Sequence, residues 1–130
     1  MSDRIDPPGI KALGAYSQAV RVSLGNQQMI FVSGQLPLDE NGNAISGDIA
    51  AQTRRVFQNL EIVLTASGAT FADVVKAQIF LTDMNDFPTV SAIRAEYFGE
   101  SLPVSTLLEI SRTVVAGCNI EVEVIAVVGG

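Results

Sequence analysis

The sequence predicts an α+β protein whose elements follow in the order β-β-α-β-α-β-β. Three observations predict it: two adjacent runs of alternating β-forming residues near the N-terminus, two segments with helical spacing of apolar residues, and further strands between and after those segments. Two helices among five strands indicate a mixed sheet that carries both helices on one face.

The composition indicates one folded domain over residues 1–130. Hydrophobic residues make up 48% of the chain and charged residues only 17%, which is too apolar for a disordered segment. No apolar run is long enough to span a bilayer, and the acidic start of the chain has no apolar signal-peptide core. The single cysteine, Cys118, fits a reducing compartment, so we expect a cytoplasmic protein without a membrane partner.

The chain contains no histidine, which excludes histidine metal sites and the Ser-His-Asp and Cys-His nucleophile systems. Acid–base chemistry then falls to carboxylates, Tyr, Lys or ordered water. We expect neither a metal ion nor an organic cofactor. The net charge of −6 repels a phosphate backbone, so a nucleic-acid partner is not expected.

The N-terminal half is predicted to form a hairpin and then a helix. Residues 16–24 and 28–33 read as strands joined by a turn at Gly25-Asn26, and a loop with a turn at Asn41-Gly42 follows. Residues 48–67 are predicted to be helical, with Asp48 as N-cap and Gly68 just past the end. One face of this helix is apolar: Ile49, Val56, Leu60, Val63 and Leu64.

A third strand and a second helix come next. Residues 74–82 form the strand, with Val75, Ala77, Ile79 and Leu81 pointing one way. Asp86 is expected to cap the helix, with Pro88 in its first turn and Gly99 at its end. Three apolar side chains of this helix are expected to face inward: Val90, Ile93 and Tyr97.

The last two strands, residues 104–112 and 119–128, have one apolar and one mixed face each. The sets predicted to pack under the helices are Val104, Thr106, Leu108 and Ile110, then Ile120, Val122, Val124 and Ala126. The opposite sets are Ser105, Leu107, Glu109 and Ser111, then Glu121, Glu123, Ile125 and Val127. A face that mixes carboxylates with Leu, Ile and Val is typical of contact with another subunit, so we expect an oligomer.

An ordered set of short motifs resembles one known family along nearly the whole chain. The matching segments are GAYSQA at 14–19, VSGQLP at 32–37, residues 48–59, residues 76–87 ending in DMNDF, Leu102-Pro103, and IEVEVIA at 120–126. Each motif alone is weak, but their common order is specific. They resemble the Rid/YjgF family, also called endoribonuclease L-PSP or enamine/imine deaminases.

The resemblance implies a chorismate-mutase-like fold and a homotrimer whose sheets line a central barrel. It also implies three small-metabolite clefts at subunit interfaces, in which 2-enamino or 2-imino acids are hydrolysed to 2-keto acids and ammonia. By this resemblance Glu121 is the catalytic residue that places the hydrolytic water. Substrate-binding positions are then Tyr16, Ser33, Gly34, Asn85 and Ser105.

The resemblance breaks at Ser105. Archetypal members carry Pro-x-Arg-Ser at the start of this strand, and the arginine holds the substrate carboxylate. Here Pro103 precedes Ser105 by two residues and Glu109 follows it by four, so a serine stands at the arginine position. Hydrogen bonds to charged groups contribute roughly 1.5–3 kcal/mol each, so losing the clamp costs about two to four decades of binding or rate.

Other cations are candidates to replace the missing arginine. Arg112 is expected on the opposite strand face from Ser105, and Arg94 is expected to be solvated in mid-helix. Arg21 or Lys76 from a neighbouring subunit remains an alternative.

Each predicted site residue also has a purely structural interpretation. Glu121 is either a general base or a rim carboxylate of the oligomer, and Tyr16 either contacts the ligand or only packs. Asn85 is expected to cap or brace the second helix in preference to touching ligand, and Gly34 to be a turn glycine. Cys118 is expected to be an inert thiol.

The sequence therefore leaves three functions open. The first is a Rid-like hydrolase acting on an imine or enamine that Ser105 tolerates. The second is a non-catalytic protein that binds a keto-acid-like metabolite in the cleft. The third, ribonuclease activity, is disfavoured by the acidic charge and the absence of histidine.

Overall fold

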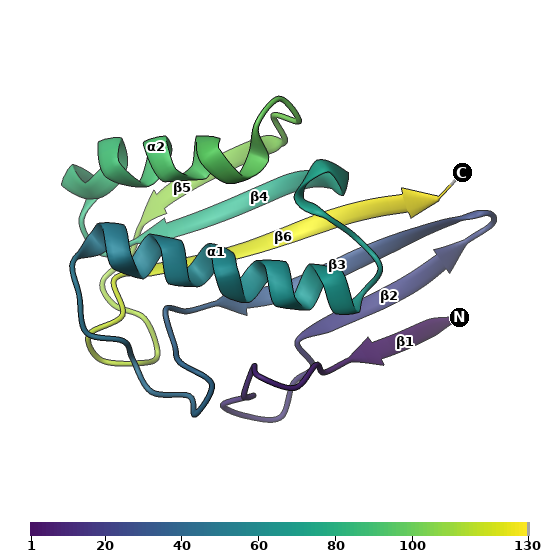
Figure 1. Ribbon diagram of the computed structural model, residues 1–130, viewed down its shortest axis with the longest axis horizontal. Coiled ribbons are helices and arrows are strands. Elements are labelled where there is room, and N and C mark those ends of the chain that lie inside the picture. Colours follow the sequence, from purple (N-terminus) through teal and green to yellow (C-terminus); the bar gives the residue numbers. More distant parts are fainter. Residues whose placement is uncertain (130) are drawn as a thin grey trace.

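The structure, a computed structural model, describes residues 1–129. One six-stranded sheet is covered on one face by two helices (Figure 1). The elements are β1 (Ser2–Ile5), β2 (Ala19–Leu24), β3 (Gln27–Gln35), α1 (Ile49–Ala66), η1 (Phe71–Asp73), β4 (Val74–Leu81), η2 (Met84–Asp86), α2 (Phe87–Phe98), β5 (Val104–Glu109) and β6 (Ile120–Gly129).

The predicted mixed sheet and helix placement are confirmed. The strand order is β1-β2-β3-β6-β4-β5, and every neighbouring pair is antiparallel except β4 and β5. α2 is the crossover that joins this parallel pair. The short edge strand β1 was not predicted, because its residues, Ser-Asp-Arg-Ile, include two charges and only one strong β-former.

The start of α1 is as predicted, but the start of α2 is not. Asp48 Oδ1 accepts a hydrogen bond from the Ala51 N–H at 2.9 Å, and Gly68, with φ +84°, follows the helix end. Asp86 makes no capping hydrogen bond, so that prediction is wrong. The carboxylate of Asp83 instead caps η2, from which α2 continues, by accepting from the Asn85 N–H at 2.9 Å.

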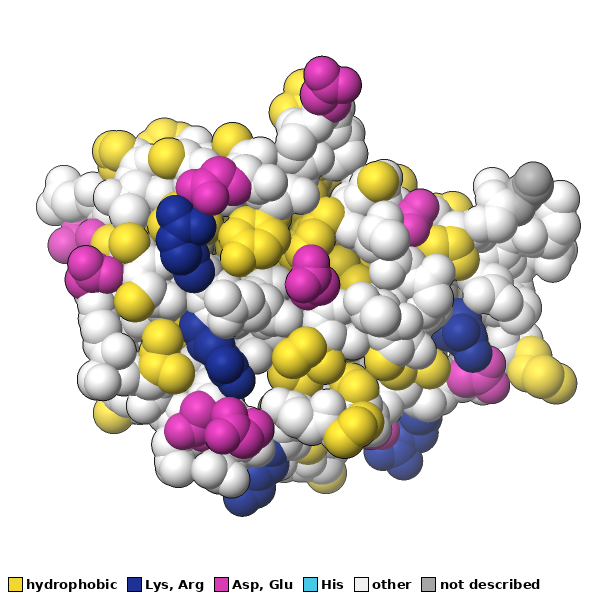
Figure 2. Space-filling view, viewed as in Figure 1, with side chains coloured by type: hydrophobic (Ala, Val, Ile, Leu, Met, Phe, Trp, Pro, Cys, Tyr) yellow, Lys and Arg dark blue, Asp and Glu magenta, His cyan; other side chains and the backbone are white. Residues whose placement is uncertain are grey.

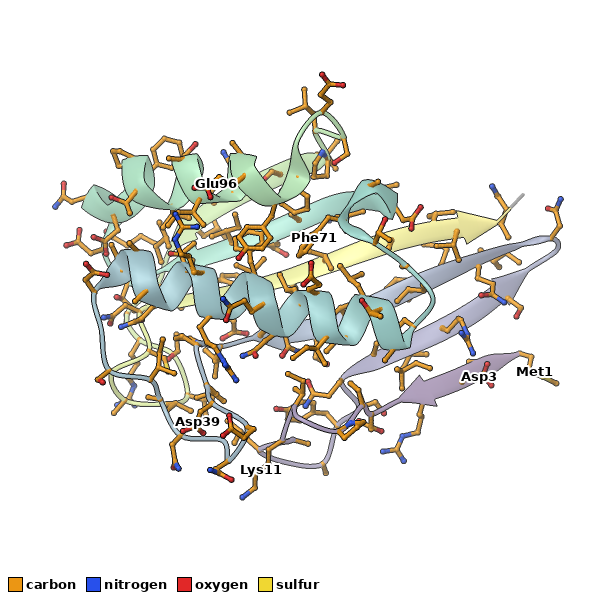
Figure 3. All side chains as sticks on the ribbon, viewed as in Figure 1. Met1, Asp3, Lys11, Asp39, Phe71 and Glu96 are labelled. Carbon is orange, nitrogen blue, oxygen red and sulfur yellow. The ribbon has the colours of Figure 1, made fainter. Side chains whose placement is uncertain are left out.

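The main core lies between the sheet and the helices, and aromatic rings fill the contact between α1 and α2. Phe57 and Tyr97 stack with their centroids 4.9 Å apart, and Phe71 packs against both rings (Figure 3). Above this cluster, Arg54 of α1 donates two hydrogen bonds to Glu96 of α2, at 3.0 and 3.1 Å. The aromatic contacts fix the position of α2 over the sheet, because an exposed ion pair such as Arg54–Glu96 contributes little.

The structure reverses the predicted faces of β5. Ser105 pairs with Ala77 and Leu107 with Ile79, and both β4 residues are fully buried under the helices. Leu107 packs against the core, whereas Leu108 is 44% exposed. The prediction failed because β5 is an edge strand with apolar side chains on both faces, so alternation alone does not identify the covered one. Ser105 therefore faces the helices.

The predicted faces of β6 are confirmed. Val122 and Val124 are buried, while Glu121, Glu123 and Ile125 alternate with them on the uncovered face of the sheet and are half-buried. On β4, Val75 is an exception to its predicted direction. The pairing with β6 shifts register between Val74 and Lys76, and this bulge turns Val75 outward.

None of the helices within residues 1–129 is long and apolar enough to cross a membrane. On the helix-covered face the Lys and Arg side chains stand apart from one another, and most have an acidic neighbour (Figure 2).

Candidate functional site

Glu121 of β6 lies on the uncovered sheet face, directly above Gly34 of β3. A β-carbon at Gly34 would overlap Glu121 Oε2 and lie 2.9 Å from its Cδ, so only glycine leaves room for this carboxylate. Among residues 1–129, no side-chain hydrogen bond or ion pair engages the Glu121 carboxylate. It is therefore free to accept a proton or a water molecule.

The environment of Glu121 favours its protonated form. Partial burial raises the pKa of its carboxyl above the usual value, and the nearby Glu123 raises that pKa further. A carboxyl whose pKa is shifted toward neutrality both takes and returns a proton efficiently, as a general acid–base catalyst must.

A β-bulge presents Gly34 to Glu121. The register between β3 and β6 shifts between Val32 and Gln35, so two residues, Ser33 and Gly34, face one residue of β6. Ser33 Oγ donates to the Ser17 carbonyl at 2.7 Å, and Gln35 Nε2 donates to Gln18 Oε1 at 2.8 Å. These bonds hold the bulge, so the Ser33 hydroxyl has a structural partner within the chain.

Tyr16 lies near the bulge and is partly exposed. Its hydroxyl accepts from the Leu13 N–H at 3.2 Å, and its ring lines a small cavity together with Gly34 and Asn59. Asn59 of α1 donates to the carbonyls of Leu36 and Leu38, both at 3.0 Å, and so braces the segment that follows Gly34. The structure thus brings Tyr16 and Gly34 together.

Asn85 lies in η2, between the end of β4 and the start of α2. Its N–H donates to Asp83, and its side chain is exposed. The neighbouring Met84 N–H donates to Glu109 Oε1 at 2.9 Å, which ties η2 to β5. The predicted capping role belongs to Asp83, and Asn85 supplies only the backbone donor.

Ser105 contacts a cation, contrary to the expectation that Arg94 is solvated. Arg94 Nη1 donates to Ser105 Oγ at 3.1 Å, and Nη2 donates to Ser91 Oγ at 3.2 Å. A sequence signal for this contact exists: Arg94 follows Val90 by four residues and precedes Tyr97 by three, so it shares the stripe of α2 that faces the sheet.

The predicted site residues fall into separate groups within one chain. Glu121 pairs with Phe80, and Phe80 with Leu108, so all three lie on the uncovered face. Ser105 and Leu108 are an odd number of residues apart on β5, so their side chains point to opposite faces. Ser105 therefore lies on the helix-covered face, where it contacts Arg94. Gly34 is the predicted site residue brought against Glu121, and Tyr16 lines a small cavity together with Gly34, whereas Ser105 lies on the opposite face of the sheet.

The other cations that the sequence suggested are placed differently. Arg21 donates to Asp3 at 3.3 Å and to the Ser67 carbonyl at 3.2 Å, so it has partners in its own chain. Lys76 is exposed on the uncovered face, in a groove that Phe31 also lines. Arg112 is exposed in the loop after β5.

Neither a reactive thiol nor a metal cluster is found in residues 1–129. Cys118 is buried, and burial raises the pKa of its thiol, which favours the unreactive protonated form. No group of three or more potential ligand side chains within these residues is arranged to hold a metal ion.

Comparison with known proteins agrees with this fold over nearly its full length. The family model described as endoribonuclease L-PSP matches residues 8–128. A RutC family protein of Pyrococcus abyssi is 47% identical over 103 residues, which are 78% of this chain and 78% of that protein. The rat 2-iminobutanoate/2-iminopropanoate deaminase is 40% identical over 119 residues, which are 91% of this chain and 83% of that protein.

Among solved structures, the YjgF gene product of E. coli superposes with a TM-score of 0.83 at 35% identity, covering 96% of this chain and 98% of that one. Sequence and structure thus agree on one family along the same stretch of chain. The chain belongs to the Rid/YjgF family, whose members carry the endoribonuclease L-PSP domain.

Proposed function

We propose that this protein hydrolyses a small imine or enamine metabolite to a carbonyl compound and ammonia. The observation that carries the proposal is the Glu121 carboxylate. It is half-buried and lies over Gly34, no side chain within residues 1–129 bonds to it, and burial raises its pKa above the usual value. Relatives that share most of this chain are named as 2-imino acid deaminases, which supports the same reaction class.

The reaction needs one group that moves protons at the carbon of a C=N bond. The substrate enters as the protonated imine. Glu121 takes a proton from water as the water oxygen bonds to the carbon, and the C=N π electrons pass to nitrogen, which gives a neutral carbinolamine. The protonated Glu121 then returns its proton to that nitrogen, the C–N bond breaks to release ammonia, and C=O forms as the hydroxyl proton passes back to Glu121 or to solvent. The sum is imine plus water to carbonyl plus ammonia, with no cofactor consumed.

We further propose that the site is completed between subunits of a homotrimer. Glu121 and Ser105 lie on opposite faces of one sheet, so a substrate in contact with both requires a second copy of the chain. The uncovered face supports this assembly because it exposes Phe31 beside the half-buried Ile125 and Leu108 beside Phe80.

An ammonia-release assay tests the reaction. An amino-acid oxidase generates 2-imino acids in place, and the rate of ammonia release is compared with and without the protein. We expect acceleration by the wild type and a loss of about 10²–10⁴-fold in Glu121→Gln, because that substitution removes the proton acceptor. Glu61→Gln, the same change on the exposed surface of α1, serves as the control and should retain full activity.

Absence of acceleration by the wild type would reject the deaminase and favour the second candidate, a non-catalytic binder of keto-acid-like metabolites. The serine at position 105 is the observation that favours that candidate. Calorimetric titration with 2-keto acids tests it, and Glu121→Gln should then bind as the wild type does. Ribonuclease activity is disfavoured by the net charge of −6 and the absence of histidine.

A further inference from the structure

A groove of about 360 Å³ runs between α2 and the start of β5. This volume suits a small metabolite. The polar side chains of the groove are Ser91, Arg94 and Ser105, and its walls are apolar, including Phe87, Leu102 and Leu107. A cavity with apolar walls and a few convergent polar groups is typical of a small-molecule site.

Among residues 1–129, Arg94 is the only charged side chain that lines this groove. Within residues 1–129 no carboxylate lies within 4.0 Å of its guanidinium, whereas four other arginines, Arg4, Arg21, Arg54 and Arg55, each have an acidic partner. Its two hydrogen-bond acceptors are neutral hydroxyls, which orient the guanidinium without compensating its charge.

The two serines leave Arg94 ready to bind an anion. Ser91 occupies one N–H of Nη2 and Ser105 one N–H of Nη1, so Nε and the second N–H of each terminal nitrogen remain as donors. A planar carboxylate fits such a pair of parallel donors. Because both hydroxyls act as acceptors toward Arg94, their own O–H groups are also available to donate to the same anion.

The mouth of the groove carries backbone strain and exposed apolar surface. Leu102 adopts φ +43°, a left-handed conformation that is costly for a leucine, and its side chain is 80% exposed beside the groove. An apolar side chain held outward in this way suits contact with the alkyl part of a ligand or with a second copy of the chain.

We propose that Arg94, positioned by Ser91 and Ser105, is the cation that binds the carboxylate of a small 2-keto or 2-imino acid in this groove. The identity of the acid rests on the proposed function, but the anion site rests on the groove itself. The positive charge that archetypal family members carry on a strand, at position 105, is supplied here by Arg94 on α2.

Calorimetric titration with 2-oxobutanoate tests the site, with 2-butanone as a probe of similar shape that lacks the carboxylate. We expect the wild type to bind the acid and to bind the ketone at least tenfold more weakly. Arg94→Gln should weaken binding of the acid by about 10- to 100-fold, the range for losing a charge-assisted hydrogen bond. Arg54→Gln, which removes a cation from the outer side of the α1–α2 contact, is the matched control and should bind as the wild type does.

Arg94→Lys separates charge from geometry. Lysine keeps the positive charge but lacks the planar fork, so binding should fall between that of the wild type and Arg94→Gln. Circular dichroism and thermal melting of each variant establish that it is folded. The proposal is overturned if the folded wild type does not bind 2-oxobutanoate, if Arg94→Gln binds it equally well, or if Arg54→Gln weakens binding as much.

A parallel ammonia-release assay distinguishes this inference from the proposed function. Arg94-dependent binding without deamination by the wild type would reject the reaction and leave the anion site standing. Deamination that Arg94→Gln retains at the wild-type rate, with an unchanged KM, would overturn the role of Arg94 and leave the reaction standing.

Discussion

At the scale of single residues, the position of the Glu121 carboxylate depends on the absence of a side chain at Gly34. Gly34 does not use a left-handed backbone conformation, so glycine is required there for space and not for φ. The atoms that an added methyl would meet belong to the end of the Glu121 side chain, which can rotate away. The cost of filling this space should therefore fall on function more than on folding.

Gly34→Ala tests this separation. The new methyl displaces the Glu121 carboxylate, and a misplacement of about 1 Å at a reacting group can cost on the order of 10²-fold in rate. We expect a loss of that order in ammonia release, with a free energy of unfolding within about 1 kcal/mol of the wild type, measured by urea denaturation. A variant with full activity would show that the position of Glu121 over Gly34 is not needed.

The raised pKa of Glu121 makes stability depend on pH. The folded state binds the Glu121 proton more tightly than the unfolded state, in which this carboxyl has the usual pKa of 4.5. The stability contributed by the protonated carboxyl is therefore present below pH 4.5. It is lost as the pH rises through the folded-state pKa. Glu121→Gln should therefore be more stable than the wild type at pH 7, and the difference should vanish near pH 3.5. Urea denaturation at both values measures this, and Glu61→Gln should show no such pH-dependent difference.

The predicted direction of the Glu121 side chain is confirmed and the predicted surroundings of Arg94 are wrong, for a physical reason. Strand alternation has a period of two, so the direction of Glu121 followed from its buried neighbours on the same strand. Arg94 sits at the edge of the apolar stripe of α2, where a long side chain can reach either solvent or the sheet. The distance between α2 and β5 decides whether the Arg94 side chain reaches Ser105 or solvent. That distance is set by the aromatic packing of α1 against α2.

At the scale of elements, the two helices begin differently. α1 has a side-chain cap at Asp48, whereas α2 continues from η2 and takes no hydrogen bond from Asp86. Short-range signals at the two starts look alike in the sequence, because each has an aspartate before an apolar helical pattern. The η2 turn that moves the cap to Asp83 is held by Glu109 of β5, a contact that local sequence does not encode.

The caps can be compared by alanine substitution. Asp48→Ala removes a hydrogen bond to the Ala51 N–H and should lower the free energy of unfolding by about 1 kcal/mol. Asp86→Ala removes no capping bond, and its carboxyl has a pKa raised first by burial and then by Asp83, so its loss should cost less. Urea denaturation of both variants at pH 7 measures the difference, and equal losses would contradict the capping assignment.

At the scale of the whole molecule, one sheet face is covered and the other is not. The order of the main elements along the chain and the placement of both helices on one sheet face were predictable from periodicity, whereas the order of the strands within the sheet was not. The covered side of β5 was not, because it depends on the parallel register with β4. The uncovered face carries Phe31, 42% exposed, beside half-buried carboxylates, which is a composition suited to burial against further copies.

Phe31→Glu tests the proposed trimer. A charge at this position should weaken association, so light scattering should show a trimer for the wild type and smaller species for the variant. Ile62→Glu is the control, because Ile62 is similarly exposed but lies on the outer surface of α1. A monomeric wild type would overturn the trimer, and dissociation by both variants would show that the uncovered face is not the specific interface.

The contact between Arg94 and Ser105 also limits how this chain can evolve. A guanidinium introduced by Ser105→Arg would lie where the Arg94 guanidinium already sits, and two like charges in one groove repel. The same substitution should therefore impair ligand binding in the wild-type background yet restore it in a background that carries Arg94→Gln. A cation on α2 and a cation on β5 would therefore compete for the same place in the groove, so this chain can use either one but not both together.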